Sequence, residues 1–294
     1  MVLNRSTGSK IFSVINYAIL GLLTVSCLYP LWYTLCVSIS QKAAVNAGMV
    51  TIWPIGANLT SYRQIMKDTL FLNSFWVSIQ RTVLGTVITL LVLVMMAYPI
   101  SKPKREYRHR NRIMWLVIFC MVFNGGVVPW FITMQRYGLL NNVIGLVLAG
   151  SLPVFNLLLI MNFFRSLPRD LEEAAIIDGA NPWVILFRVV VPCSVPVLAT
   201  IALFTSVYHW NEFFQGLVLS TGQQHYPLQT YIQQMVVTIP SGQMTPDMMM
   251  KLERLSNKSL DAAKVFIAMV PMLCVYPFLQ RYFITGIMLG AMKE

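Results

Sequence analysis

The chain has 294 residues, of which 56% are apolar and only 11% charged, and its mean hydropathy is +0.64. A soluble domain carries roughly 25% charged residues, so this composition excludes an ordinary soluble protein and places most of the chain in lipid. The formal net charge of +11 would suit a nucleic-acid partner, but the basic residues are distributed as membrane-topology signals, and no nucleic-acid site is expected.

Six apolar stretches are long enough to cross a membrane, which takes about 20 residues of helix. Each contains Gly, Pro or a lone polar residue, which membrane helices tolerate when neighbouring helices satisfy the backbone. We therefore predict an all-α polytopic membrane protein whose residues 1–294 form a single transmembrane domain in contact with lipid. The predicted spans are 11–38, 74–100, 113–135, 142–164, 186–210 and 263–288.

Lys and Arg concentrate in the loops that we expect on the cytoplasmic side. Four such segments carry 13 of the 22 basic residues, and the short loop from Lys102 to Arg112 carries six of them. Short basic loops are retained in the cytoplasm, so both chain termini are predicted to be cytoplasmic. The first span is expected to stay as an uncleaved anchor, because its apolar run is too long for a signal peptide. The four segments expected on the cytoplasmic side are residues 1–10, 101–112, 165–188 and 281–294.

Arg81 lies seven or eight residues into the second predicted span, roughly 12 Å along the axis at 1.5 Å per residue. An ionisable group at such a depth is costly, and it is a functional-site hypothesis by default. It could face a cavity and bind an acidic ligand, pair with Glu212, or cap backbone carbonyls. It could also extend to the outer interface.

Trp130 follows Gly125, Gly126 and Pro129 within the third predicted span. This pattern predicts an interrupted helix beside a pore. A kink that serves only packing is an equally good interpretation.

A short helix is predicted between the fourth and fifth spans. Asp170 is expected as its N-cap, and Glu173 stands three residues later, as in a capping box. Gly179 suits the left-handed residue that ends a helix, and Pro182 blocks continuation. A second helix is expected to start near Asn181.

A helix of two turns is marginal by itself, so something must hold it. Ala174 and Ala175 would let another surface approach the backbone closely, and Leu171, Ile176 and Ile177 would add apolar contact. The acidic residues of the segment would pair with charges at the rim. This combination suits docking to a partner, and the alternative is a plain connecting loop.

Polar and aromatic residues cluster at the end of the fifth span. Aromatic faces suit the C–H faces of sugar rings, and Asn or Glu can accept hydrogen bonds from hydroxyl groups. An aromatic belt at the membrane interface is an equally good interpretation. A metal site is not expected, because His209 and Glu212 have no third ligand near them in the sequence. The cluster comprises Tyr208, His209, Trp210, Asn211 and Glu212.

The segment after the fourth span resembles the EAA loop of ABC-importer permeases. The last outer loop, the Trp210–Glu212 turn and the closing stretch from Gln280 to Lys293 are similar to those of carbohydrate-uptake permeases. The likeness is strongest to the maltose-permease (MalG-like) branch that handles oligosaccharides and polysaccharide fragments, including alginate. Val191 is a conservative departure from the EAA-loop pattern, which more often has Ile at this position. The matching positions are Glu173–Ala175, Asp178–Ala180, Phe187, Val191–Pro192 and Pro196.

The resemblance implies a type I importer permease in a bacterial inner membrane, paired with a second homologous permease in a heterodimer. It also implies two ATP-binding subunits and an extracytoplasmic sugar-binding protein. The permease itself would perform no bond chemistry, and ATP and Mg²⁺ would bind to the partner subunits. In such permeases the loop enters a cleft of the ATPase and couples its closure to alternating access. The residues that match this coupling role are Glu172, Glu173, Ala174, Ala175, Asp178, Gly179 and Ala180.

Acidic oligosaccharides of the alginate or pectin type are the expected substrates, because Arg81, Arg136 and external Lys residues would attract them. Neutral sugars are the alternative within the same class. An ion-coupled secondary transporter is the rival class, and it predicts paired broken helices or intramembrane acids. The Asp and Glu residues of this chain lie in loops or at the ends of spans, which disfavours a secondary transporter. The expected substrate path contains Arg81, Trp130, Tyr208, Trp210, Asn211 and Glu212.

Overall fold

The computed structural model describes residues 7–150, 152–237 and 257–291, and these residues form helices and loops without a β-strand. The all-α prediction is therefore confirmed for this part of the chain. The chain divides into two compact units, which are described separately. Unit 1 comprises Met1–Thr69 with Thr238–Val270, and unit 2 comprises Leu70–Val237 with Pro271–Glu294.

Unit 1 holds α1 (Thr7–Ser38), α2 (Lys42–Asn46), α3 (Thr60–Ile65) and the first part of α16 (Lys258–Ala291). Most of α1 exposes apolar side chains, and only its last three residues are buried, as expected for a segment that faces lipid. The start of α16 is fixed by an ion pair between Lys264 Nζ and Asp68 Oδ2, at 2.7 Å.

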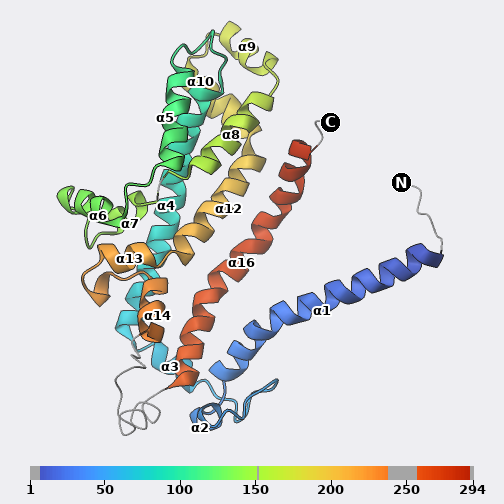
Figure 1. Cartoon of the computed structure of the whole chain (residues 1–294), viewed down its shortest axis with the longest axis vertical. Coiled ribbons are helices and arrows are strands. Elements are labelled where there is room, and N and C mark those ends of the chain that lie inside the picture. The colour runs from blue at the N-terminus through green and yellow to red at the C-terminus, as the bar shows by residue number, and fades with distance from the viewer. Residues whose placement is uncertain (1–6, 151, 238–256, 292–294) are drawn as a thin grey trace. The chain divides into compact units, whose positions relative to one another are not determined.

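The core of unit 2 is formed by side chains from α4, α5, α8 and α12, and α8 contacts both α5 and α12 (Figure 1). Leu93 and Ala97 on α4, Leu157 and Ile160 on α8, and Ile201 on α12 have no exposed surface. Close van der Waals packing of this kind holds helices together where lipid replaces water. The helices of unit 2 are α4 (Thr69–Ser101), α5 (Arg110–Val122), α6 (Val127–Arg136), α7 (Val143–Leu148), α8 (Val154–Ser166), α9 (Asp170–Ile177), α10 (Pro182–Ile185), η1 (Leu186–Val190), α11 (Val191–Cys193), α12 (Val195–Asn211), α13 (Phe214–Leu219), η2 (Gln223–His225) and α14 (Leu228–Val237).

Every predicted span overlaps a helix, but not all of these helices are straight. In the described residues, α1 and α4 are unbroken helices that are long and apolar enough to cross a membrane. Two further candidate spans are bent pairs, α5 with α6 at 115° and Pro182–Cys193 with α12 at 82°. The stretches 113–135 and 186–210 are therefore not single straight helices, and the stretch 142–164 is divided between two separate helices, α7 and α8.

The bend between α5 and α6 has a local cause. Gly126 has a φ of 83°, which glycine adopts without steric penalty, and its N–H donates to Asn124 Oδ1 at 2.9 Å. The interruption predicted near Trp130 is thus present. The bend before α12 falls at Ser194, between Pro192 and Pro196, and proline is a recognised cause of sharp kinks.

Candidate functional site

The first candidate site is the α9–α10 segment, at one end of unit 2 beyond α5 and α8 (Figure 1). The predicted capping box at its start is wrong. Arg169 precedes the helix with φ −66° and ψ −30°, and no side chain caps the first turn. Because Arg169 is already helical, Asp170 belongs to the first turn. There it still complements the helix dipole, together with Glu172 and Glu173.

The end of α9 follows the prediction. Gly179 has a φ of 78°, Gly179 N–H donates to Ile176 O at 3.0 Å, and Ala180 N–H donates to Ala175 O at 2.9 Å. This pair of bonds is the Schellman arrangement that closes a helix on a left-handed glycine. The second helix then starts as predicted, because the Asn181 side chain accepts from Val184 N–H at 2.9 Å.

The surface of α9 has two different sides. Ala175 and Ala180 pack against the core of unit 2. Leu171, Ile176 and Ile177 are instead 42%, 60% and 85% exposed. Adjacent exposed apolar side chains on a segment with acidic neighbours are typical of a surface that binds another protein. The segment therefore combines attachment to its own helices with exposed apolar side chains, of which Ile177 is the most exposed.

A cavity of about 470 Å³ lies between α9 and the loop that follows α4. One contact across it is an ion pair between the Lys102 ammonium and the Glu172 carboxylate. Burial lowers the pKa of Lys102, while Glu106 raises it and Arg169 lowers it further. The charged residues that line the cavity are Lys102, Arg110, Arg165, Arg169, Glu106, Glu172 and Glu173.

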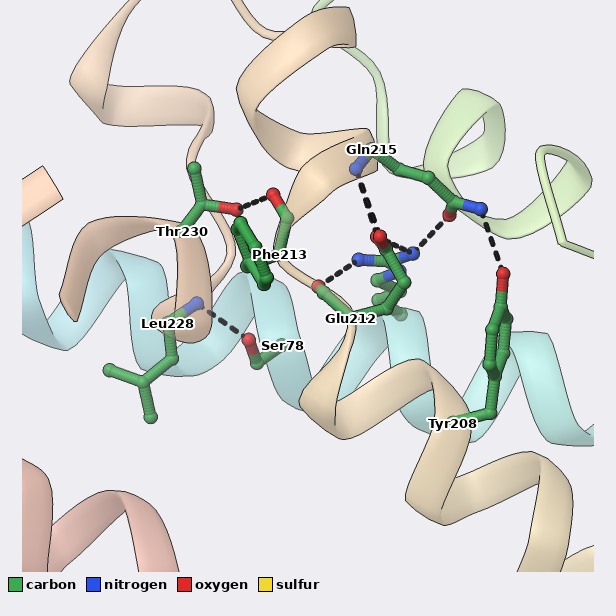
Figure 2. Close-up of polar contacts among 8 residues, drawn as sticks. Ser78, Tyr208, Glu212, Phe213, Gln215, Leu228 and Thr230 are labelled. Atoms are coloured by element: carbon green, nitrogen blue, oxygen red, sulfur yellow. Dashed lines mark hydrogen bonds and ion pairs between the residues drawn. The ribbon is translucent and has the colours of Figure 1, made fainter. Parts of the chain in front are cut away.

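The second candidate site is a polar network between α4 and the α12–α13 turn (Figure 2). The Arg81 side chain has no exposed surface. Its Nη1 donates to the Glu212 backbone oxygen at 2.9 Å, and its Nη2 donates to Glu212 Oε2 at 3.1 Å. Arg81 Nη2 also donates to Gln215 Oε1. Of the interpretations open for Arg81, the structure shows the pairing with Glu212 and the capping of a carbonyl.

The network continues from Gln215 to Tyr208. The Gln215 backbone N–H donates to both Glu212 carboxylate oxygens, at 3.1 and 3.0 Å, and thereby fixes the first turn of α13. Gln215 Nε2 donates to the Tyr208 hydroxyl at 2.9 Å, and Figure 2 shows the phenol pointing toward this amide. Sequence reasoning missed Gln215, because nothing in its local pattern distinguishes it from other glutamines.

Tyr208, Glu212 and Gln215 line a cavity of about 840 Å³, together with Trp130. Tyr208 also lines a second cavity of about 600 Å³, so the phenol stands in a wall that the two cavities share. Among the described residues that line the larger cavity, Glu212 carries the only formal charge, and none is Lys, Arg or His. The cavity therefore offers aromatic faces, hydroxyls and amides rather than a free cation.

Three of the predicted path residues, the fully buried Arg81 together with Trp210 and Asn211, do not line either cavity. Trp210 is only 3% exposed and packs edge-on against Phe75, with the ring centroids 5.9 Å apart. Asn211 is exposed, and its Nδ2 donates to Val207 O at 3.0 Å. Among the described residues, no group of three His, Cys, Asp or Glu side chains is placed to bind a metal ion.

A helical membrane domain with an exposed segment at one end and an open cavity lined by polar and aromatic side chains has the features of a membrane transport subunit. Residues 74–289 match the family "Binding-protein-dependent transport system inner membrane component", and the chain belongs to this family. The resemblance inferred from the loop motif is thereby confirmed, as is the permease fold.

Two curated relatives from Bacillus subtilis (strain 168) match over nearly the whole chain. Protein LplC is 34% identical, covering 99% of this chain and 98% of the relative. The polygalacturonan/rhamnogalacturonan transport system permease protein YtcP is 31% identical, covering 97% and 99%. Each of the two matches extends over nearly the full length of the relative.

Solved structures give the same result. A chain of a bacterial ABC transporter involved in the import of the acidic polysaccharide alginate matches with a TM-score of 0.84 and 33% identity, covering 95% of this chain and 98% of that one. A second match is to an alginate ABC transporter in complex with an alginate pentasaccharide-bound periplasmic protein, with a TM-score of 0.55 and 15% identity. The second likeness shows the fold alone.

Proposed function

We propose that this chain is the permease subunit of an ATP-driven importer of acidic oligosaccharides or polysaccharide fragments, of the alginate or pectin type. The observation that carries the proposal is the full-length likeness to a chain of the alginate importer. The likeness to a permease for polygalacturonan and rhamnogalacturonan, which also contain uronate residues, supports the same substrate class. On this proposal the chain lies in a bacterial inner membrane with both termini in the cytoplasm.

The α9–α10 segment is the proposed contact with the ATPase subunits. Leu171 and Ile177 expose apolar surface that a partner can bury, while Ile176 lines the cavity beside Lys102. Glu173 is exposed on the same helix and can pair with a basic rim. Closure of the ATPases on ATP and Mg²⁺ would then displace α9, and the helices of unit 2 would follow it. Hydrolysis would reset the channel inward.

The 840 Å³ cavity is the proposed segment of the sugar path. Tyr208 and Trp130 supply aromatic faces for sugar rings, and Gln215 supplies an amide for hydroxyl groups. Arg81 does not line this cavity, and its donors point at Glu212 and Gln215. We therefore assign Arg81 the task of holding the cavity wall. Charge recognition of a uronate falls instead to a solute-binding protein and a second permease, which we propose as partners.

The residues that line the 840 Å³ cavity favour a second candidate function, the import of neutral oligosaccharides. Among its described residues there is no cation, and Glu212 would repel a carboxylate. Relatives with neutral substrates exist at lower identity, for example the melibiose/raffinose/stachyose import permease protein MelC from Bacillus subtilis, at 26%.

One experiment separates these proposals. The chain is reconstituted with its second permease, ATPase subunits and binding protein, and ATP hydrolysis is measured with a uronate and with a neutral oligosaccharide. Stimulation by the uronate alone supports the first proposal, and stimulation by the neutral sugar alone overturns it in favour of the second. No stimulation by either, in an assembled complex, contradicts both.

Coupling is tested in the same complex by comparing Glu173→Lys with Glu173→Gln, which removes the charge without reversing it. Loss of sugar stimulation in the lysine variant, with the complex still assembled, supports transmission through α9. Normal stimulation and transport in that variant would refute the role of Glu173.

A further inference from the structure

The C-terminal end of α4 is held by charged side chains from two other helices. The Ile100 carbonyl accepts one hydrogen bond from Arg110 Nε at 3.1 Å and another from Arg165 Nη2 at 3.1 Å. Arg110 begins α5, and Arg165 lies in the last turn of α8. Cations at the negative end of a helix dipole are stabilising, so this end of α4 is fixed to α5 and α8.

Lys102 follows the last residue of α4 and makes the connection to α9. Its ammonium pairs with the carboxylate of Glu172, in the first turn of α9. The same nitrogen lies 4.4 Å from the centroid of the Tyr98 ring, one turn back on α4. The Lys102 and Glu172 side chains are only 18% and 22% exposed. Lys102 is therefore held on both sides, rather than extended into solvent as a topology signal.

We propose that Lys102 is a positioning residue that attaches the ATPase-docking helix α9 to the end of α4, so that a displacement of α9 also moves α4. This inference rests on the proposed function, since it needs an ATPase to displace α9. The first turn of α9 has a directional attachment through Glu172. The rest of α9 is attached through apolar packing of Ala175 on the core of unit 2 and through contacts with α10 and η1.

The proposal also assigns a destination for the movement. α4 continues without a break from Ser101 back to Arg81, about 30 Å at 1.5 Å per residue. At that point Arg81 holds Glu212 and Gln215 in the wall of the cavity. One continuous helix, with Pro99 in its last turn, thus lies between an ion pair to α9 at its end and an ion pair to the cavity wall further along.

Charge reversal tests the proposal in the complete reconstituted transporter, where sugar-stimulated ATP hydrolysis by the wild type is established first. Without that stimulation, the proposed function itself has failed. Lys102→Glu and Glu172→Lys are then measured singly and together, by sugar transported per ATP hydrolysed. Each single variant is expected to lower this ratio at least about fivefold, the lower range of energetic coupling between sites. The double variant is expected to return to within about twofold of wild type.

Lys104→Glu is the matched control, because Lys104 lies in the same loop with an exposed side chain. It is expected to leave the ratio unchanged. A double variant that is no better than the single variants would overturn the proposal, as would single variants that behave like the control. If the reversed variants do not assemble, Lys102→Gln and Glu172→Gln are judged by the ratio alone. Loss of assembly in all of them would assign the pair to folding and overturn the proposal.

Discussion

The imidazole of His209 on α12 lies directly against Gly85 of α4. A Cβ at position 85 would lie 2.5 Å from His209 Nε2, closer than side chains approach each other in proteins. Both residues are buried, so the ring has little room to turn away. Glycine at this position allows α4 and α12 to approach as closely as they do, as small residues do in membrane helix pairs.

Gly85→Ala is therefore expected to lower the thermal stability of the purified permease, by about 1–3 kcal/mol of overpacking. The measurement is thermal unfolding in detergent. His209→Ala in the same background should recover most of the loss, because neither ring nitrogen makes a hydrogen bond within the described residues. Additive losses in the double variant would show that the close approach does not cause the effect.

Arg81→Met should destabilise the permease by about 3–5 kcal/mol, because the substitution leaves the Glu212 carboxylate largely buried without its cation. The Glu212 side chain is 14% exposed, so water partly screens its unpaired charge. The expected loss of stability therefore lies toward the lower end of this range. Thermal unfolding measures this loss, and Arg136→Met, on the exposed end of α6, is the control.

The double variant Arg81→Met with Glu212→Gln separates wall support from substrate binding. If Arg81 supports the wall, the double variant regains stability and transports uronates. Recovered stability without uronate transport would instead restore Arg81 as a substrate contact.

The residues around α9 show what local sequence can predict. Gly179, Asn181 and Pro182 act through their own backbone preferences, so the helix end and the next helix start were readable from the sequence. The capping box at Asp170 failed because the backbone turns helical at Arg169, one residue earlier. Helix starts depend on the path of the preceding chain, which local composition does not encode.

The candidate cavity shows what local sequence could not predict. Arg81 and Gln215 are 134 residues apart, and their contact depends on how α4 and the α12–α13 turn pack. The apolar runs predicted which segments lie in lipid, but hydropathy does not encode the direction in which a helix runs. The 115° and 82° bends therefore could not be read from it. Gly125, Gly126 and Pro129 signalled the first interruption, whereas the second was not predicted.

Tyr208→Ala should change transport more than Tyr208→Phe, because the ring forms the wall between the two cavities while the hydroxyl makes one hydrogen bond to Gln215. Loss of a neutral hydrogen bond of about 1 kcal/mol predicts roughly a fivefold change at most for the phenylalanine variant. The measurement is the sugar concentration for half-maximal transport. Tyr137→Ala, at a residue 76% exposed, is the control. Equal effects of the two Tyr208 variants would contradict a role for the ring.

Gly179→Ala should weaken the end of α9 through backbone conformation alone. Its φ is 78°, and a Cβ there would meet no atom within 4 Å. The expected penalty is therefore the left-handed conformation itself, about 1–2 kcal/mol. Sugar-stimulated ATP hydrolysis is expected to fall while the melting temperature of the membrane domain stays nearly constant. Gly179→Asn should do less harm, because asparagine tolerates this region better. An asparagine variant as impaired as the alanine variant would point to a cause other than backbone strain.

Ile177→Ser tests the exposed apolar side chains of α9 as the ATPase contact. The side chain is 85% exposed in the isolated chain, so its removal should leave the fold of the permease intact. Burial of an isoleucine by a partner contributes about 1.5–3 kcal/mol, so binding of the ATPase subunits should weaken roughly tenfold or more. Co-purification and titration of the ATPase onto the detergent-solubilised permease measure this. Ile52→Ser, on an exposed residue of unit 1 outside the docking segment, should bind like wild type. If both variants bind the ATPase equally well, the partner docks elsewhere, and the exposed isoleucines of α9 need another explanation.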